Sequence, residues 1–146
     1  MGSYRKDFAG WAKVAEEIEK RERRDVKTGA IYWAGLGASI GSELAGKGER
    51  FVRPVLILEK INQRMVMAVP VTSRVHNRRG YHEVIVTGKL ESLALEQTRP
   101  IDILRVGDFI DEVAPVELER IWKHWMRLMK YHFYKKSSPA EAERDF

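Results

Sequence analysis

The chain has 146 residues, a formal net charge of +5 and no cysteine. This length suits one domain that buries a core without disulfides, and the lack of cysteine excludes thiolate catalysis and Cys-ligated zinc and suits a reducing compartment. No apolar run approaches the about 18 residues of a membrane span and the N-terminus lacks a secretory apolar core, so we expect a cytoplasmic protein without a membrane segment.

The first expected element is a helix over residues 7–24. Asp7 is a suitable N-cap, and Phe8, Trp11 and Ile18 fall at helical spacing. The charged run at its end, residues 20–24, either contacts phosphate or is simply a solvated helix end. We expect residues 1–28 to form a helical extension to the main domain.

From residue 30 the pattern changes to strands. Strands are expected over residues 31–33, 52–59, 65–72, 81–86 and 93–96, with a further one at 101–104, and Asn62-Gln63 and Thr87-Gly88 mark turns between them. Several short strands separated by turn residues predict a small barrel or sandwich.

A long helix is expected after the strands. Pro115 suits its first turn, and an apolar stripe follows at three- and four-residue steps, made of Leu118, Ile121, Trp122, Trp125, Leu128, Met129 and Phe133. This stripe predicts a core or subunit contact. Residues 29–136 would thus form the main domain, and residues 137–146 a polar tail.

Two common sites are excluded by the residues around them. Residues 41–47 (GSELAGK) match the start of a phosphate-binding loop, but Gly48 follows where Ser or Thr would hold magnesium, and a strand follows where a helix is needed. His76, His82, His124 and His132 form no helical i, i+4 pair and have no cysteine beside them. We therefore expect no nucleotide hydrolysis, no metal and no cofactor.

Three polar clusters remain as candidate sites, each with a purely structural alternative. The glycine-rich loop carries Ser42, Glu43, Lys47 and Arg50 and ends at Arg53, or it is a flexible hairpin loop with an incidental arginine. Thr72 and Ser73 close a strand, where hydroxyls often bond only to nearby backbone. A basic loop that could clamp phosphate or be solvated follows, with Arg74, His76, Arg78 and Arg79.

The third cluster comes later in the chain. Glu96, Gln97, Arg99 and Asp102 follow one another within seven positions. Arg99 and Asp102 either form a structural ion pair at a turn or take part in catalysis or partner binding.

Taken in order, these segments resemble the MazF/PemK family of toxin ribonucleases from toxin–antitoxin pairs. The resemblance covers about residues 30–129 and rests on five motifs, namely Ile31-Tyr32-Trp33, Gly41-Ser42-Glu43, Arg53-Pro54-Val55, residues 69–73 (VPVTS) and residues 96–102 (EQTRPID). It implies an SH3-like β-barrel with a C-terminal helix, an α+β, β-rich fold, to which this chain adds an N-terminal helix. It also implies a homodimer that binds single-stranded RNA across its face.

The resemblance also implies a mechanism. Family members cleave RNA without a metal, through attack of the 2′-hydroxyl on the adjacent phosphorus. By position, Arg53 matches the catalytic arginine, Thr72 the threonine beside it, and Glu43 the loop glutamate near the active site. A cationic arginine is a poor base, so Glu43 and Glu96 both stay candidates for accepting the proton.

This sequence also departs from one plasmid-encoded branch of the family. That branch has a histidine at the position of Ser42 and an arginine at the position of Ala94, and both side chains are missing here. The leading hypothesis is a sequence-selective mRNA endoribonuclease silenced by a cognate antitoxin. The alternative is a non-catalytic barrel that binds nucleic acid or a protein.

Overall fold

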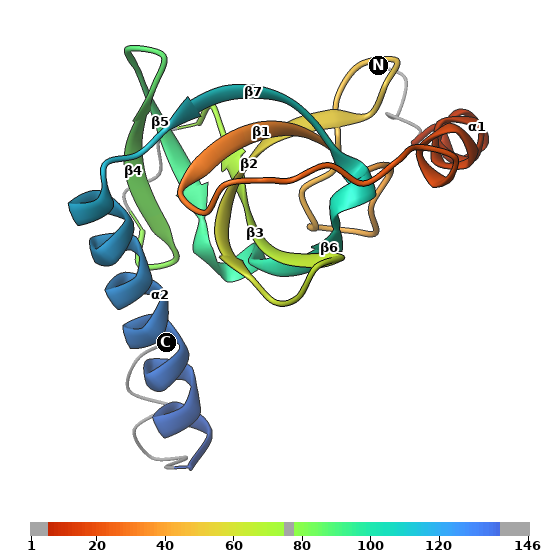
Figure 1. Cartoon of the computed structure of the whole chain (residues 1–146). Coiled ribbons are helices and arrows are strands. Elements are labelled where there is room, and N and C mark those ends of the chain that lie inside the picture. The colour runs from red at the N-terminus through yellow and green to blue at the C-terminus, as the bar shows by residue number, and fades with distance from the viewer. Residues whose placement is uncertain (1–5, 75–77, 138–146) are drawn as a thin grey trace.

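The computed structural model of the chain describes residues 6–74 and 78–137, with His76 and the tail over 138–146 outside the described residues. A curled antiparallel sheet lies between two helices, α1 (Phe8–Glu19) and α2 (Pro115–Ser137) (Figure 1). The strands are β1 (Ala30–Gly35), β2 (Val52–Lys60), β3 (Met65–Thr72), β4 (Tyr81–Val86), β5 (Lys89–Ala94), β6 (Arg99–Asp102) and β7 (Val106–Glu112), with 3-10 helices η1 (Leu95–Gln97) and η2 (Ile103–Arg105) among them.

The sheet is built around β3. Its strand order is β4-β5-β3-β2-β1-β7, and β6 pairs with β3 off this path. Residues 65–68 of β3 pair with β6, whereas Val71 and Thr72 pair with β5. Pro70 stands where β3 changes neighbour, a position that tolerates a missing backbone N–H. The curl that results confirms the expected small β-barrel with a C-terminal helix, and the sheet closes only part of the way round.

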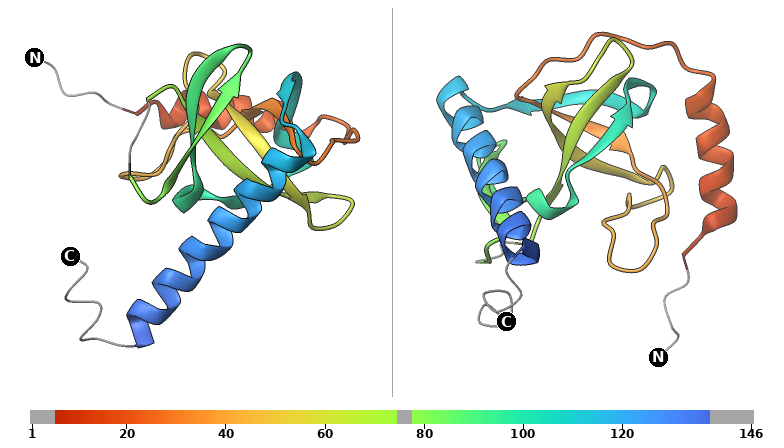
Figure 2. Two further views of the ribbon diagram at one scale, coloured as in Figure 1. Left: turned by 90° about the vertical axis from the view of Figure 1, so that its left-hand side faces the viewer. Right: turned by 90° about the horizontal axis from the view of Figure 1, so that it is seen from below.

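The two helices lie on opposite sides of the sheet (Figure 2). Asp7 caps α1 as expected, since its carboxylate accepts a hydrogen bond from the Gly10 N–H at 2.8 Å. Only Ile18 of α1 is buried. The helix therefore covers little of the core and sits against the barrel as an addition to it.

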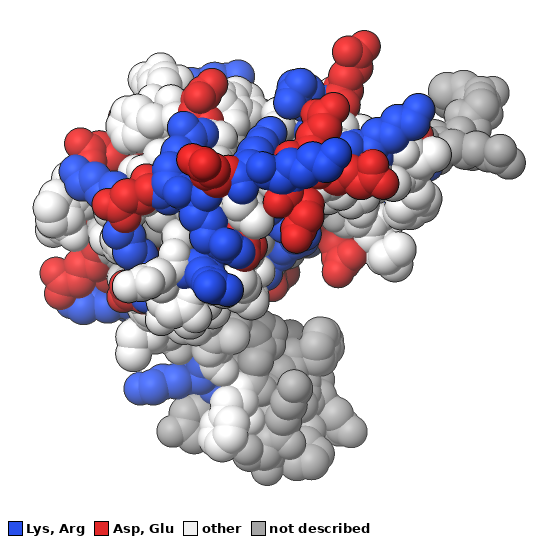
Figure 3. All heavy atoms as spheres, turned by 45° about the vertical axis from the view of Figure 1, so that its right-hand side comes forward, with Lys and Arg blue, Asp and Glu red and all other residues white. Residues whose placement is uncertain are grey.

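The predicted helix over 7–24 is too long by five residues, because α1 ends at Glu19. The chain beyond it is held extended by contacts with the barrel. Arg23 forms a two-pronged ion pair with Asp102, at 3.0 and 2.7 Å, and Asp25 pairs with Lys60. On the face that carries α1, basic and acidic side chains are interspersed (Figure 3). The charged run is thus neither a helix end nor a uniformly basic surface.

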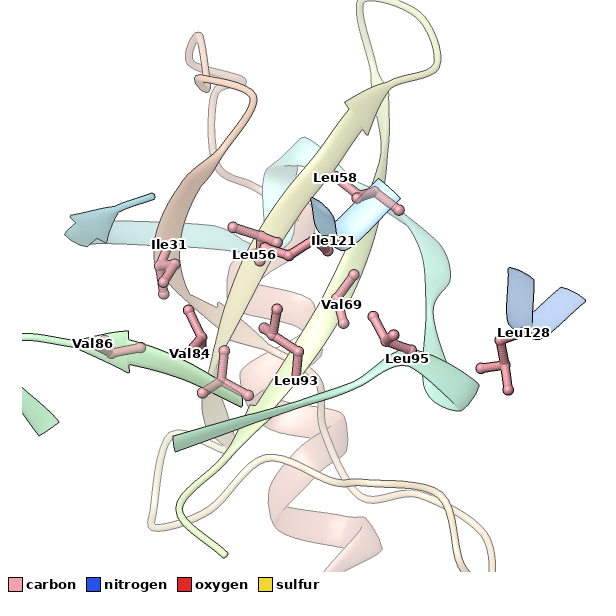
Figure 4. Close-up of a cluster of buried hydrophobic side chains, with 11 residues drawn as sticks. Ile31, Leu56, Leu58, Val69, Val84, Val86, Leu93, Leu95, Ile121 and Leu128 are labelled. Atoms are coloured by element: carbon pink, nitrogen blue, oxygen red, sulfur yellow. The ribbon is translucent and has the colours of Figure 1, made fainter. Parts of the chain in front are cut away.

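The core lies on both faces of β2. Residues 55–58 are all fully buried, and successive side chains of a strand point to opposite faces. Leu56 and Leu58 join a cluster that includes Ile121 and Leu128 of α2 (Figure 4), whereas Val55 and Ile57 join a second cluster with Val26 and Val106. The strand that begins next to Arg53 is therefore held rigidly.

The apolar stripe of α2 is confirmed as core for most of its length. Ile121 and Leu128 are buried, and Leu118, Trp122 and Trp125 pack against the same cluster. The stripe then leaves the barrel, since Met129 and Phe133 are 37% and 67% exposed. Within residues 6–74 and 78–137, no helix combines the length and apolar character that crossing a bilayer requires.

Three strand expectations need correction. The strand expected over 93–96 lies earlier, as β5, and Leu95–Gln97 form η1. The strand expected over 101–104 is shifted to β6 and runs into η2. β7 has no counterpart among the expected strands, because its pairing with β1 is interrupted by register shifts and no regular alternation of apolar residues marks it.

Candidate functional site

Arg53 and Thr72 lie beside each other at one end of the barrel. In the β2–β3 pairing Val55 faces Pro70, so continuing the register by two residues places Arg53 opposite Thr72. The Arg53 Nη1 donates a hydrogen bond to the Val71 carbonyl at 3.2 Å, directly before Thr72. Two strands of the rigid core thus hold the arginine and the threonine side by side.

Both side chains are covered. Arg53 and Thr72 are each 7% exposed. The cover over Arg53 comes from the loop over residues 36–51, the β1–β2 loop, whose Ala45 carbonyl accepts a hydrogen bond from the Arg53 Nε at 2.7 Å. Burial lowers the pKa of the Arg53 guanidinium from its ordinary value, yet an arginine remains cationic. The structure therefore places a positive charge beneath a loop, bound to backbone carbonyls.

The covering loop is tied to the third cluster through Gln97. Its side-chain oxygen accepts a hydrogen bond from the Leu44 N–H, and its side-chain nitrogen donates to the Ser42 carbonyl at 3.2 Å. Glu43 accepts from the Ile40 N–H at 2.8 Å, which closes a turn within the loop. Ser42, Glu43 and Gln97 are therefore brought together, as a contact between two segments more than fifty residues apart.

A cleft of about 400 Å³ opens beside these residues. It is lined by the loop, by Pro70 of β3 and by the segment that follows β5, with Glu43, Glu96 and Arg99 among its side chains. The Glu96 side chain lies close over Gly80, where an added Cβ would be 2.3 Å from its carboxyl carbon. Both candidate proton acceptors thus face one cleft, whose lining includes neither Arg53 nor Thr72.

The basic segment after β3 is only partly assembled with this site. Ser73 and Arg74 are exposed directly after Thr72, and the Arg74 N–H donates to the Thr72 Oγ1 at 3.3 Å. Arg78 contacts the Tyr81 ring, and Arg79 lies over the Tyr131 ring of α2. Arg78 and Arg79 are therefore committed to aromatic side chains on the side of the barrel that carries α2.

Lys47 and Arg50 lie on the outer arm of the β1–β2 loop. The Lys47 backbone pairs with Val52 in an isolated bridge, and the Arg50 guanidinium lies 3.8 Å from the Glu17 carboxylate of α1. Both side chains are exposed. The interpretation of Arg99 and Asp102 as an ion pair is wrong, because Asp102 pairs with Arg23 and its side chain also accepts from the Leu104 N–H.

A larger cavity lies elsewhere among the described residues. It measures about 760 Å³ and separates α1 from β1 and β7, with Trp33, Arg50 and Arg105 on its walls. Neither Arg53 nor Thr72 lines it. In the part of the chain that the structure describes, no group of three or more His, Asp or Glu side chains is placed to hold a metal ion.

Residues 27–128 match the model of a family described as PemK-like, MazF-like toxin of type II toxin-antitoxin system. The chain belongs to the PemK/MazF toxin family. The match begins after α1, so the N-terminal helix lies outside the PemK/MazF domain. No curated protein matches the chain.

Solved structures of PemK/MazF proteins share the fold. The Mycobacterium tuberculosis toxin MazF-mt6 is 17% identical, with a TM-score of 0.53 over 69% of this chain and 96% of its own. A mycobacterial endoribonuclease in complex with its cognate antitoxin is 14% identical, with a TM-score of 0.54 over 73% and 96%. The MazE-MazF complex from Deinococcus radiodurans is 18% identical, with a TM-score of 0.54 over 72% and 96%.

Sequence reasoning missed the residues that hold the loop down. Trp11 and Lys6 contact the β1–β2 loop from the N-terminal segment, and Gly37 receives the Trp11 ring. The helical spacing of Phe8, Trp11 and Ile18 indicates an apolar face, but it does not show which part of the protein that face packs against. The resemblance could not supply it either, since its motifs begin after this helix.

Proposed function

We propose that this toxin is an endoribonuclease that cuts single-stranded mRNA selectively by sequence and without a metal ion. Two findings support the proposal. The chain belongs to a family whose toxins are endoribonucleases, and Arg53 and Thr72 occupy neighbouring positions on β2 and β3. The second finding carries the most weight, because it is the pair of groups that the chemistry needs.

The reaction would be an in-line displacement at phosphorus. The ribose 2′-oxygen forms a bond to the phosphorus, the bond to the 5′-oxygen breaks, and the products carry a 2′,3′-cyclic phosphate and a 5′-hydroxyl. Negative charge builds on the phosphoryl oxygens, where the Arg53 fork can donate two hydrogen bonds. The Thr72 hydroxyl can donate a third and orient the phosphate.

A carboxylate must take the proton of the 2′-hydroxyl, and water can return one to the leaving 5′-oxygen. Glu43 and Glu96 remain the candidates because both line one cleft with Leu44, the neighbour of the Ala45 that covers Arg53. Glu43 already accepts a backbone hydrogen bond within the loop. The Glu96 side chain lies close over Gly80, so either carboxylate would have to leave a present contact to meet the 2′-hydroxyl.

RNA access requires the β1–β2 loop to move. The Arg53 side chain is bound to the Ala45 carbonyl and almost fully buried, so a phosphate must replace that carbonyl to reach the guanidinium. We propose that the exposed cations Lys47, Arg50 and Arg74, with Ser42, Ser73 and Gln97, contact RNA once the loop has shifted. Arg78 and Arg79 would join them by leaving their contacts with the Tyr81 and Tyr131 rings.

The protein incubated with total mRNA in a chelator tests the proposal. New 5′ ends are mapped and their chemistry determined. We expect cuts at a short common sequence, 5′-hydroxyl ends, and a loss of at least about 100-fold in rate for Arg53→Lys, since an ammonium cannot replace the fork. Arg64→Lys, at an exposed position in the β2–β3 turn, is the matched control and should cleave normally.

Intact RNA of diverse sequence would contradict the nuclease proposal. Growth arrest that survives Arg53→Ala in cells would instead favour a non-catalytic barrel that binds nucleic acid or a protein. Arg53→Ala leaves two backbone carbonyls without their donor, so its thermal unfolding is measured alongside, and Arg53→Lys serves if the alanine variant fails to fold.

We also propose a cognate antitoxin and a homodimer. Two of the solved relatives are complexes with an antitoxin, and an acidic, partly disordered segment would complement the net charge of +5. Met126, Met129 and Phe133 leave an apolar surface on the outer part of α2. A second copy of the chain would cover that surface.

A further inference from the structure

The helix α1 contacts the loop that covers Arg53. The Trp11 ring lies on the Gly37 backbone, where an added Cβ would be only 2.2 Å from the ring. The same ring packs against Phe51 at the far end of the loop, with 5.8 Å between ring centres. One side chain therefore touches both arms of the β1–β2 loop, and the loop lies between α1 and the barrel (Figures 1 and 2).

Polar groups of the same N-terminal segment reinforce this contact. The Lys6 ammonium donates to the Ser39 carbonyl and, at 3.4 Å, to the Gly41 carbonyl. Glu17 pairs with Arg50 at the loop's outer arm. From below, Arg105 lies over the Trp11 ring and also donates to the Gly35 carbonyl at 2.9 Å. The helix is thus attached along the loop rather than at one point.

The loop conformation that α1 holds is strained. Phe51 has a φ of 56°, in the left-handed region that a bulky residue rarely adopts. Its carbonyl accepts hydrogen bonds from both Leu36 and Gly37, which closes the loop at its base. A strained backbone persists only where its surroundings over-determine it, and Trp11 supplies the ring contact on Phe51.

The other side of the loop reaches the candidate site. Ala45 covers the Arg53 guanidinium, and Gln97 holds the loop at Ser42 and Leu44. A continuous series of contacts therefore runs from Trp11 through Phe51 and the loop to Arg53. We propose that Trp11 is a positioning residue of the toxin, which holds the β1–β2 loop closed and so keeps Arg53 from RNA.

The effect on RNA cleavage rests on the proposed function, whereas the role of Trp11 in holding the loop does not depend on it. The nuclease is restrained by its own N-terminal helix, a segment outside the PemK/MazF domain over residues 27–128. Loosening the helix exposes the guanidinium while Arg53 and Thr72 keep their places on β2 and β3. A partner that binds α1 would act as an activator in the same way.

The test compares Trp11→Ala with Phe8→Ala in the full chain. Phe8 lies on the same helix, is 51% exposed and makes no ring contact with the loop. Hydrogen exchange is followed by mass spectrometry on peptides that cover residues 36–51, where the Gly46 and Lys47 N–H groups are bonded within the loop. We expect the loop peptides to exchange at least about fivefold faster in Trp11→Ala than in the unchanged chain. We expect no change in Phe8→Ala, and protection close to that of the unchanged chain in Trp11→Phe.

Lys6→Ala provides a second variant, which removes the hydrogen bonds from the half-buried Lys6 ammonium to the Ser39 and Gly41 carbonyls, and it should raise exchange in the same peptides by a smaller factor. Peptides from β3 and α2 serve as internal references for global unfolding. Equal loop exchange in Trp11→Ala and Phe8→Ala would overturn the proposal.

Cleavage of RNA is then measured at concentrations below saturation. We expect Trp11→Ala to raise kcat/KM several-fold, mainly through a lower KM, because RNA reaches Arg53 more easily while Arg53 and Thr72 keep their positions. Faster loop exchange together with slower cleavage would overturn the role as a restraint. Faster exchange with no cleavage by any variant would leave the loop contact intact and defeat the nuclease proposal instead.

Discussion

At the scale of single residues, the site combines a rigid base with a removable cover. Arg53 and Thr72 belong to β2 and β3, whose side chains fill both core clusters, so their relative position is set by the barrel. The exposure of Arg53 is limited by the β1–β2 loop, which Ala45 bonds to Arg53 and Gln97 holds at Ser42. Chemistry and access therefore depend on different residues.

Thr72→Val distinguishes the contribution of the Thr72 hydroxyl to catalysis from its contribution to the stability of the fold. Valine has nearly the shape of threonine, and among the described residues the lost acceptor serves the Arg74 N–H at the barrel's exposed end. We expect a stability change below about 1 kcal/mol and a fall of about 100-fold in kcat, the cost of removing one donor to developing charge. Chemical denaturation and single-turnover cleavage measure the two, and unchanged kcat would remove Thr72 from the mechanism.

At the scale of elements, α2 is joined to β4 by a pair of histidines. The Nδ1 atoms of His82 and His124 lie 2.9 Å apart, which requires one proton between them. The His124 Nε2 donates to the Arg79 carbonyl, and the His82 Nε2 lies 2.7 Å from the Glu117 carboxylate. Protonating His124 would place a second hydrogen in the Nδ1 contact. The junction is therefore sensitive to acid.

The fold should lose stability as pH falls below about 6.5. Desolvation, with the nearby His82 and Arg127 charges, lowers the pKa of His124 in the folded chain from its ordinary value of 6.5. The unfolded chain then takes up the proton at a higher pH, so stability is full above 6.5 and declines as pH falls toward the folded pKa. Urea unfolding between pH 8 and 5 measures this, at intervals of about one unit.

His124→Gln is the comparison for that experiment, because glutamine can donate to the Arg79 carbonyl and does not titrate. Its stability should depend less on pH across the same range. An identical slope in both proteins would show that the histidine junction does not contribute.

Elements whose patterns are local could be predicted well. The Asp7 N-cap, β3 and β4 agree with the sequence expectation to the residue, because a cap and a short alternation are complete within a few positions. The end of α1 could not be predicted. It is decided by Arg23, which meets Asp102 at a distance of 79 positions along the chain.

At the scale of the whole molecule, the outer part of α2 is the surface that a second copy would cover. Met126 and Met129 are 48% and 37% exposed and lie on either side of the buried Leu128 along the helix. Large apolar side chains gathered on one helix commonly mark an interface. This surface lies on the opposite side of the barrel from α1 (Figure 2), so dimer formation leaves the loop contact undisturbed.

Replacing Met126 and Met129 together by glutamate should convert a dimer to a monomer, since charge in an apolar interface costs more than the contact returns. Light scattering gives the mass across a range of concentrations. Lys13→Glu changes the net charge by the same amount at an exposed position of α1, on the opposite side of the barrel (Figure 2), and as the control it should remain a dimer. A monomeric wild-type chain would instead remove the dimer from the proposal.

The sequence by itself determined the family and the strand or helix character of most elements. It also predicted that Arg53 and Thr72 are neighbours, because both lie in motifs that resemble those of the family. Only the tertiary structure showed that the β1–β2 loop buries Arg53, that Gln97 holds this loop by hydrogen bonds, and that Trp11 packs on Gly37. The reason is physical. Periodicity and helix caps depend on residues within one segment. The burial of the Arg53 charge depends instead on contacts between segments that are far apart in the sequence. The spacing of residues within one segment does not specify those contacts.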